Sequence, residues 1–124
     1  MLSVCLLITV LLAGCQTTNS GAPANYAFPS NYRQLVAHKV VEGTKHIGPI
    51  LSATVSRPVD RFVGVMSGGS RPVVCATTTN QGRLISQTTH WLFLFENGQV
   101  ASAIPNPPAI HCISVQDEPF PDAL

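Results

Sequence analysis

Apolar residues recur at helical spacing just after residue 30 and, from Pro49 onward, at alternate positions. The first spacing predicts a helix over residues 31–42. Its apolar side consists of Tyr32, Leu35, Val36 and Val40. Asn31 with Gln34 three residues on resembles a capping box, and Ser30 is the alternative cap. Gly43 is the expected stop.

The alternating pattern beyond Pro49 predicts a series of short strands. The expected strands are residues 51–56, 62–66, 73–79, 90–95 and 100–103. Asn97-Gly98 predicts a type I′ hairpin turn, because both residues tolerate positive φ angles. Residues 80–89 are polar and predict connecting chain, whereas residues 117–124 predict a loose tail.

The apolar run 91–95 has apolar residues on both faces, which indicates a central strand covered on each side. Trp91, Phe93 and Phe95 share one face and are interpreted as core, with a binding stripe as the alternative. The fold class is therefore α+β, with one N-terminal helix packed on a small antiparallel sheet of four to five strands. The domain is expected to cover residues 31–116, followed by the tail.

An apolar leader from Leu2 to Leu12 precedes the sequence Leu12-Ala13-Gly14-Cys15, which is typical of a bacterial lipobox. The leader is too short to span a bilayer, which takes about 20 residues. A core helix is disfavoured because the polar run 16–30 follows at once. No Lys or Arg precedes the leader, so either the true start lies upstream or the leader is atypical.

We therefore expect residues 1–14 to be a lipoprotein signal peptide and Cys15 to be acylated, with residues 15–30 forming a flexible tether. Two or three acyl chains hold a protein stably on a membrane. Gln16 after the cysteine favours the outer membrane, facing the periplasm. Tyr26 and Phe28 are expected to dock on the domain or on a partner.

The charge of the chain is close to zero, with 7 Lys and Arg against 6 Asp and Glu. Nucleic-acid binding depends on a basic face that releases counterions, so this balance argues against it. It also supplies no electrostatic attraction to an anionic membrane. The acyl chains on Cys15 are then the expected link to the membrane.

Two cysteines, Cys75 and Cys112, remain once Cys5 is lost with the leader and Cys15 is acylated. In an oxidising periplasm they are expected to form a disulfide. The alternatives are unpaired buried thiols, or a nucleophilic Cys75 assisted by a histidine. The apolar neighbours of Cys75 raise a thiol pKa, which disfavours the nucleophile.

Other candidate chemistry is weak, and no cofactor or metal site is expected. The histidines are His38, His46, His90 and His111, and the carboxylates nearest to a pairing are Glu42, Asp60 and Glu96. The histidines lack metal-ligand spacing, and the carboxylates lie at element ends. The glycine-containing stretch 67–70 lacks a following Lys or helix, so it predicts a hairpin turn rather than a phosphate site.

The stretches Pro72-Val73-Val74-Cys75-Ala76 and Trp91-Leu92-Phe93-Leu94-Phe95-Glu96-Asn97-Gly98 carry a family resemblance. The chain resembles small proteobacterial envelope lipoproteins with a "VC" strand and an F-x-F-x-N-G hairpin. The resemblance covers residues 30–102. It implies an envelope location and no particular activity.

The leading functional hypothesis is a non-enzymatic, lipid-anchored envelope protein with a structural or protein-interaction role. An envelope protein partner would meet a sheet edge or the proline-rich segment 104–110. The alternative is a small-ligand or peptidoglycan-binding module. Its pocket would be lined by Trp91 or Tyr32, with Arg61 or Arg71 converging on it. A Cys75 hydrolase is the third hypothesis.

Overall fold

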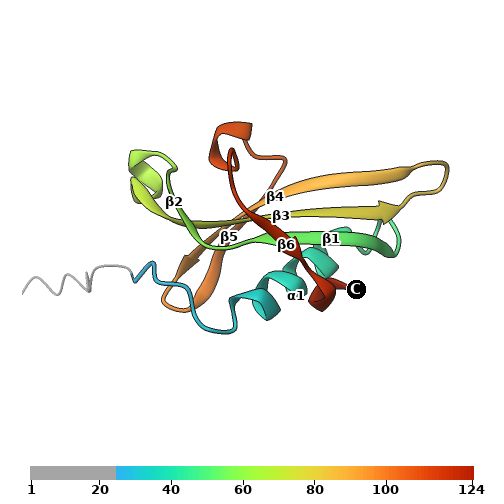
Figure 1. Cartoon of the computed structure of the whole chain (residues 1–124), viewed down its shortest axis with the longest axis horizontal. Helices are drawn as coiled ribbons and strands as arrows, with labels where there is room; N and C mark the ends of the chain where they lie inside the picture. The colour runs from blue at the N-terminus through green and yellow to red at the C-terminus, as the bar shows by residue number, and fades with distance from the viewer. Residues whose placement is uncertain (1–24) are drawn as a thin grey trace, which may run out of the picture.

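Helix α1 (Tyr32–Thr44) lies across one face of an antiparallel six-stranded sheet in the computed structural model of the chain (Figure 1). The structure describes residues 25–124. The predicted signal peptide, Cys15 and the tether up to residue 24 lie outside the described residues. The predicted α+β class is confirmed, and the sheet is slightly larger than the four to five strands expected.

The sheet has the strand order β5-β4-β3-β1-β6, and β2 also pairs with β3. The strands are β1 (Ile50–Ser56), β2 (Val59–Phe62), β3 (Ser70–Gln81), β4 (Ser86–Glu96), β5 (Gln99–Pro105) and β6 (Asp117–Pro119). One edge of β3 pairs with β2 near its start and with β1 near its end. Pro58, which has no N–H to donate, separates these two strands.

The hairpin of β3 and β4 is longer than the alternation predicts, because its pairing continues to Gln81 opposite Ser86. The polar connection expected over residues 80–89 is therefore wrong, and only residues 82–85 link the two strands. Thr88 and Thr89 explain the difference. Threonine is polar but β-branched, so it fits a strand whose face is exposed to water.

The strand expected over residues 62–66 is displaced, since β2 ends at Phe62. The chain then forms a loop that contains the short 3₁₀ helix η1 (Val65–Ser67). Gly64, with a φ of 104°, turns the backbone out of the extended conformation. β2 and β3 are antiparallel, as the predicted hairpin requires, but residues 63–69 connect them and Ser70 already belongs to β3.

Two apolar clusters lie on opposite faces of the sheet. The buried members on the helix side are Val36, Ala37, Val40, Val55, Val74, Ala76, Trp91, Phe93, Phe95, Phe120 and Ala123. On the other face they are Val73, Cys75, Leu92 and Leu94. The prediction that strand 91–95 is central and covered on both faces is confirmed, with its three aromatic side chains in the core.

The C-terminal segment belongs to the domain, so the loose tail predicted for residues 117–124 is wrong. Its first residues form β6, which pairs with β1 from Thr54 to Ser56. The 3₁₀ helix η3 (Pro121–Ala123) follows, and Phe120 between them is only 1% exposed. β6 has three residues and ends in a proline, so it is too short to produce a periodic pattern in the sequence.

The segment before the helix also packs on the domain, so residues 25–30 do not form part of a flexible tether. The ring centroids of Phe28 and Phe95 lie 4.4 Å apart. The Asn97 N–H donates to the Asn25 carbonyl at 2.7 Å, and the Asn25 N–H donates to Asn97 Oδ1 at 3.2 Å. Asn97 and Gly98 have positive φ angles, which confirms the predicted turn.

The ends of α1 differ from the expected caps. Asn31 occupies the N-cap position but makes no side-chain hydrogen bond, so the capping box is wrong. The helix continues past Gly43 to Thr44, whose Oγ1 donates to the Val40 carbonyl at 2.7 Å. Gly43 therefore does not stop the helix. It lets the helix approach the ring of Trp91 closely, because a Cβ at this position would lie 2.8 Å from Trp91 Cη2.

We expect Gly43→Ala to lower the free energy of unfolding by about 1 kcal/mol, although alanine is the better helix former. The added methyl group meets a rigid, buried ring. Urea unfolding of this variant, and of Gly43→Ala in a Trp91→Phe background, separates the clash with the Trp91 ring from the gain in helix propensity. In that background the clash is absent, so the same change should stabilise the protein. Destabilisation of equal size in both backgrounds would contradict this account.

Candidate functional site

A disulfide links the sheet to the segment that follows β5. Cys75 in β3 is bonded to Cys112, which follows the short 3₁₀ helix η2 (Ala109–His111), with an S–S distance of 2.06 Å. The predicted pairing is confirmed. The sulfur of Cys75 is therefore not available as a thiolate, and the nucleophile interpretation of this residue is wrong for the disulfide-bonded protein.

The disulfide holds residues 106–116, here called the cover segment, over the sheet face opposite α1 (Figure 1). Cys112 and Val115 of this segment pack on the smaller apolar cluster, together with Val59 and Val63. Arg61 adds a polar link, because its Nη2 donates to the Ile113 carbonyl at 2.7 Å. The cover segment is thus held by a covalent bond, apolar contacts and a hydrogen bond.

A cleft of about 430 Å³, here called the disulfide cleft, lies between the sheet and the cover segment. Its apolar lining consists of Cys75, Ala76, Pro107, Ala109, Cys112, Ile113 and Val115. Its polar lining consists of Thr77, His90, Asn106 and Asp117. An apolar cleft with a few converging polar groups is the usual form of a small-ligand site.

Neighbouring strands place the polar groups of the disulfide cleft. Thr77 of β3 lies opposite His90 of β4, and Thr77 Oγ1 is 3.1 Å from His90 Nδ1. The Asn106 N–H donates to the His90 carbonyl at 2.6 Å, which holds the start of the cover segment against β4. Asn106 has a φ of 51°, an uncommon conformation for a residue other than glycine.

The sheet continues beyond the cleft as a surface of hydroxyl-bearing side chains, here called the hydroxyl face. Alternation from Cys75 places these residues on the face of the cover segment. One row across β1, β3 and β4 consists of Thr54, Thr77 and His90. The next row consists of Ser52, Thr79 and Thr88. Thr79 Oγ1 and Thr88 Oγ1 lie 3.1 Å apart. Hydroxyl groups both donate and accept hydrogen bonds, so this face suits a ligand rich in hydroxyl and amide groups.

The pocket expected from the sequence is not formed, because its aromatic and basic residues lie apart. Trp91 is core, and its Nε1 donates to Thr78 Oγ1 at 3.1 Å. Arg71 is buried, donates to the carbonyls of Ser67 and Phe95, and stacks on Tyr26. The residues of the disulfide cleft carry no sequence motif, since only the strand pairing brings them together.

The candidate metal and acid–base residues form no cluster in the part of the chain that the structure describes. No group of three or more His, Cys, Asp or Glu side chains gathers among residues 25–124. His38 pairs with Glu42 along α1 at 3.6 Å, and Glu96 pairs with Arg71 at 3.5 Å. The carboxylates considered for catalysis are thus on different elements.

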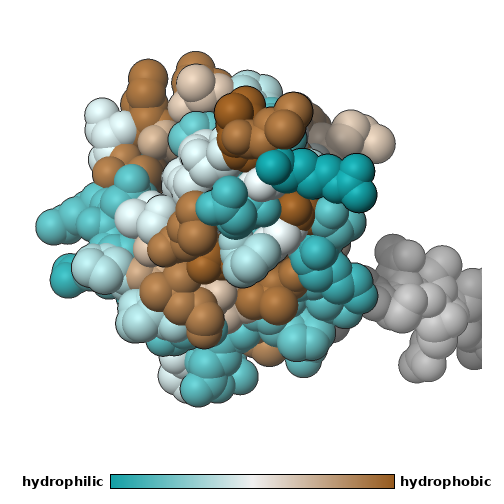
Figure 2. All heavy atoms as spheres, turned by 90° about the vertical axis from the view of Figure 1, so that its right-hand side faces the viewer, coloured by the Kyte–Doolittle hydropathy of each residue, from teal (hydrophilic) through white to brown (hydrophobic). Residues whose placement is uncertain are grey.

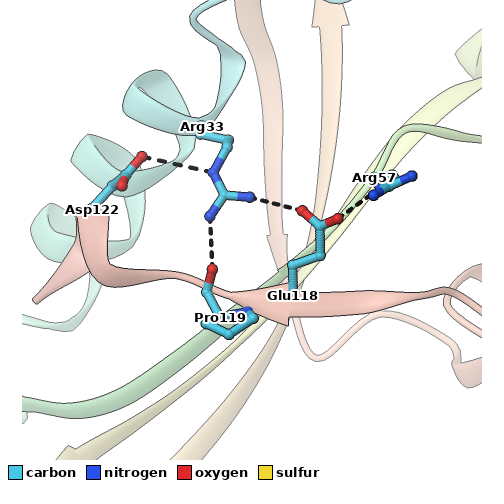
Figure 3. A network of polar contacts seen from close by, with 5 residues as sticks. All are labelled: Arg33, Arg57, Glu118, Pro119 and Asp122. Carbon is cyan, nitrogen blue, oxygen red and sulfur yellow. Dashed lines mark hydrogen bonds and ion pairs between the residues drawn. The ribbon is translucent and has the colours of Figure 1, made fainter.

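A network of ion pairs joins the C-terminal segment to the rest of the domain (Figure 3). Arg33 of α1 donates to Glu118 Oε2 at 3.0 Å and to the Pro119 carbonyl at 2.7 Å. Arg57 donates to the other carboxylate oxygen of Glu118 at 2.6 Å. Asp122 lies 3.8 Å from Arg33. One carboxylate thus connects α1, β6 and the chain after β1.

The same contacts shift two pKa values. The hydrogen bond from Arg57 lowers the pKa of Glu118 below its ordinary value of 4.5, and the charges of Arg57 and Arg33 act in the same direction. The hydrogen bond to Glu118 raises the pKa of Arg57. The folded protein therefore binds a proton at Glu118 less readily than the unfolded chain does.

We expect stability to fall as the pH drops below 4.5 through the lowered pKa of Glu118, and to be fully present above that range. Urea unfolding at neutral pH and at about pH 3 measures the effect. Glu118→Gln should lower stability at neutral pH and reduce the loss on acidification. Arg57→Gln should reduce the acid loss partly. An unchanged acid loss in Glu118→Gln would contradict the assignment.

The tip of the β3–β4 hairpin lies at the end of the molecule opposite the β4–β5 turn. Figure 2 shows the molecule from the side of this tip. Apolar side chains lie there among polar ones (Figure 2). Leu84 and Ile85 at the hairpin tip are exposed, with Arg83 beside them. This tip is an exposed apolar surface with a charged residue next to it.

Comparisons of the chain with protein-family models, with curated proteins and with solved structures give no match. Among residues 25–124, no helix has the length and apolar character needed to cross a membrane.

Proposed function

We propose that this chain is a lipid-anchored protein of the bacterial envelope with a non-enzymatic binding role, held at the outer membrane by acyl chains on Cys15 and facing the periplasm. The observation that carries the proposal is the Cys75–Cys112 disulfide. Disulfides persist in oxidising compartments such as the periplasm and are rare in the cytosol. A lipobox and a disulfide therefore favour the same location independently.

The geometry of the domain supports a binding role in two ways. The side chain that the sequence offers as a nucleophile, Cys75, is used in a structural bond. The disulfide cleft and the exposed hairpin tip at Leu84 and Ile85 are surfaces on which a ligand or an envelope protein could be held. Exposed apolar groups at a protruding tip are typical of contact sites.

The anchor is tested by Cys15→Ala, with Cys5→Ala as the matched control. Acylation requires the Cys15 thiol, so Cys15→Ala should move the protein from the membrane fraction to the soluble fraction of disrupted cells or leave its leader uncleaved. Cys5→Ala should fractionate as the unaltered protein does. Retention of a processed Cys15→Ala protein in the membrane fraction would contradict the proposal.

A second candidate function, small-ligand or peptidoglycan binding, is supported by the disulfide cleft. Its apolar lining and the hydroxyl face together fit a saccharide or peptide that has both apolar and hydrogen-bonding groups. The cover segment also contains two residues with positive φ angles, Asn106 and Ser114. Such strained positions gather at ligand sites more often than elsewhere.

This second function is tested with the full protein by co-sedimentation with insoluble peptidoglycan and by titration with an N-acetylglucosamine oligosaccharide. His90→Gln should weaken binding about tenfold, which corresponds to one lost hydrogen bond. His38→Gln, a matched change on the opposite side of the sheet, should leave the affinity unaltered. Equal affinities for the two variants would exclude the disulfide cleft as the site.

A further inference from the structure

The loop between β2 and β3 exposes large apolar side chains to water. Val65 is 82% exposed, Met66 is 99% exposed, and Phe62, the last residue of β2, is 59% exposed. Residues 62–69, here called the apolar loop, contain no charged residue. Residues 82–85, which link β3 to β4, differ in this respect because they include Arg83.

The backbone of the apolar loop satisfies many of its own hydrogen bonds. Ser67 and Gly69 donate to the Gly64 carbonyl at 3.1 and 2.8 Å, and Val63 donates to the Gly69 carbonyl at 2.9 Å. Arg71 Nη1 donates to the Ser67 carbonyl at 3.0 Å. Peptide groups that are already paired can enter an apolar medium without the large cost of unpaired ones.

The described chain begins next to this loop. A Cβ placed on Gly68 would lie 2.8 Å from Tyr26 Oη, and the Arg71 guanidinium lies 3.8 Å from the centroid of the Tyr26 ring. The mutual hydrogen bonds of Asn25 and Asn97 hold the preceding residue at the same end of the molecule. In Figure 1 the apolar loop, the β4–β5 turn and the beginning of the described chain share one end.

The chain length limits how far this end can lie from an anchor at Cys15. The ten peptide units from Cys15 to Asn25 span at most about 35 Å when fully extended. The protein end that carries Tyr26 is therefore the end held nearest to the membrane. A charge-free apolar surface in that position matches the chemistry of a bilayer better than that of water.

We propose that the apolar loop inserts Phe62, Val65 and Met66 into the bilayer that holds the acyl chains, so that the domain has a fixed orientation on the membrane. This inference rests on the proposed anchoring through Cys15. The occupant of the surface is lipid. The tip of the β3–β4 hairpin then points away from the membrane, toward the periplasm.

Tryptophan fluorescence in proteoliposomes tests this orientation. The acylated full-length protein is reconstituted in phosphatidylethanolamine–phosphatidylglycerol vesicles that contain brominated acyl chains, which quench indole fluorescence on contact. Met66→Trp places the reporter in the apolar loop, and Leu84→Trp is the matched control at a position that is 95% exposed. The one native tryptophan, Trp91, is buried and supplies the background.

We expect bromolipid to quench most of the added fluorescence of Met66→Trp and little of that of Leu84→Trp. Equal quenching of both variants, or quenching of Leu84→Trp alone, would overturn the inference. The inference would also be overturned if Met66→Trp stayed unquenched and its emission shifted to the blue as the protein concentration rose. A second copy of the chain would then cover the loop.

Vesicle flotation of the same samples separates this inference from the proposed anchoring. Acylated protein that floats with the vesicles while Met66→Trp stays unquenched refutes the inserted loop and leaves the anchor intact. Protein that carries no acyl chains and does not float refutes both. A Val65→Ser/Met66→Ser variant should still float with the vesicles through its acyl chains.

Discussion

Replacing Cys75 and Cys112 together by serine is expected to lower the free energy of unfolding by about 4 kcal/mol. The disulfide closes a loop with a sequence separation of 37, and its removal restores conformational entropy to the unfolded chain. The folded state also loses a bond that holds the cover segment on the smaller apolar cluster. The disulfide cleft should open as a result.

Urea unfolding of the double variant and of the reduced unaltered protein measures this effect. Both should show the same loss, because both lack the covalent link and keep side chains of similar size. The variant should also lose affinity for any ligand of the disulfide cleft. A loss of less than about 1 kcal/mol would show that the cover segment is held mainly by its other contacts.

Phe120→Ala is expected to lower the free energy of unfolding by about 3–5 kcal/mol, the usual cost of removing a fully buried aromatic ring. Phe120 is 1% exposed and belongs to the cluster between α1 and the sheet. Its N–H also donates to the Ala53 carbonyl at 3.1 Å, so the backbone is already placed for the ring to fill its site.

The matched control is Leu124→Ala, which removes a large apolar side chain four residues further on. Leu124 is 70% exposed, so this change should alter stability by no more than about 0.5 kcal/mol. Thermal or urea unfolding of the two variants compares them directly. Similar small losses in both would mean that residues 117–124 are the loose tail that the sequence predicts.

The fold class was predictable from the sequence because its main elements produce regular patterns. The helical spacing that begins at Tyr32 and the apolar run 91–95 each require a buried face, and both have one. The Asn97-Gly98 turn depends on two residues that tolerate positive φ angles, so this dipeptide alone is enough to predict it. The cysteine pairing followed from the expected compartment and the number of cysteines remaining.

The elements that the sequence did not reveal depend on contacts between distant residues. The segment around Phe120 is short and rich in proline, and its burial becomes apparent only when β6 pairs with β1. The aromatic residues Tyr26 and Phe28 did indicate docking, yet the sequence left open whether they dock on the domain or on a partner. Thr88 and Thr89 of β4 were predicted as connecting chain because polarity alone does not distinguish an exposed strand face from a loop.

The candidate site was less predictable than the fold. The disulfide cleft combines Thr77, His90, Asn106 and Asp117, which come from three strands and the cover segment. No spacing rule relates these positions. Their meeting is a consequence of the strand order and of the disulfide, and both are properties of the folded chain.

Intact mass spectrometry of the protein from its own membranes, with thiol alkylation before and after reduction, tests the central claim most directly. We expect a mass that lacks residues 1–14 and includes acyl chains on Cys15, and we expect Cys75 and Cys112 to be alkylated only after reduction. A chain that retains its leader and is alkylated at Cys75 without reduction would contradict both the anchor and the disulfide.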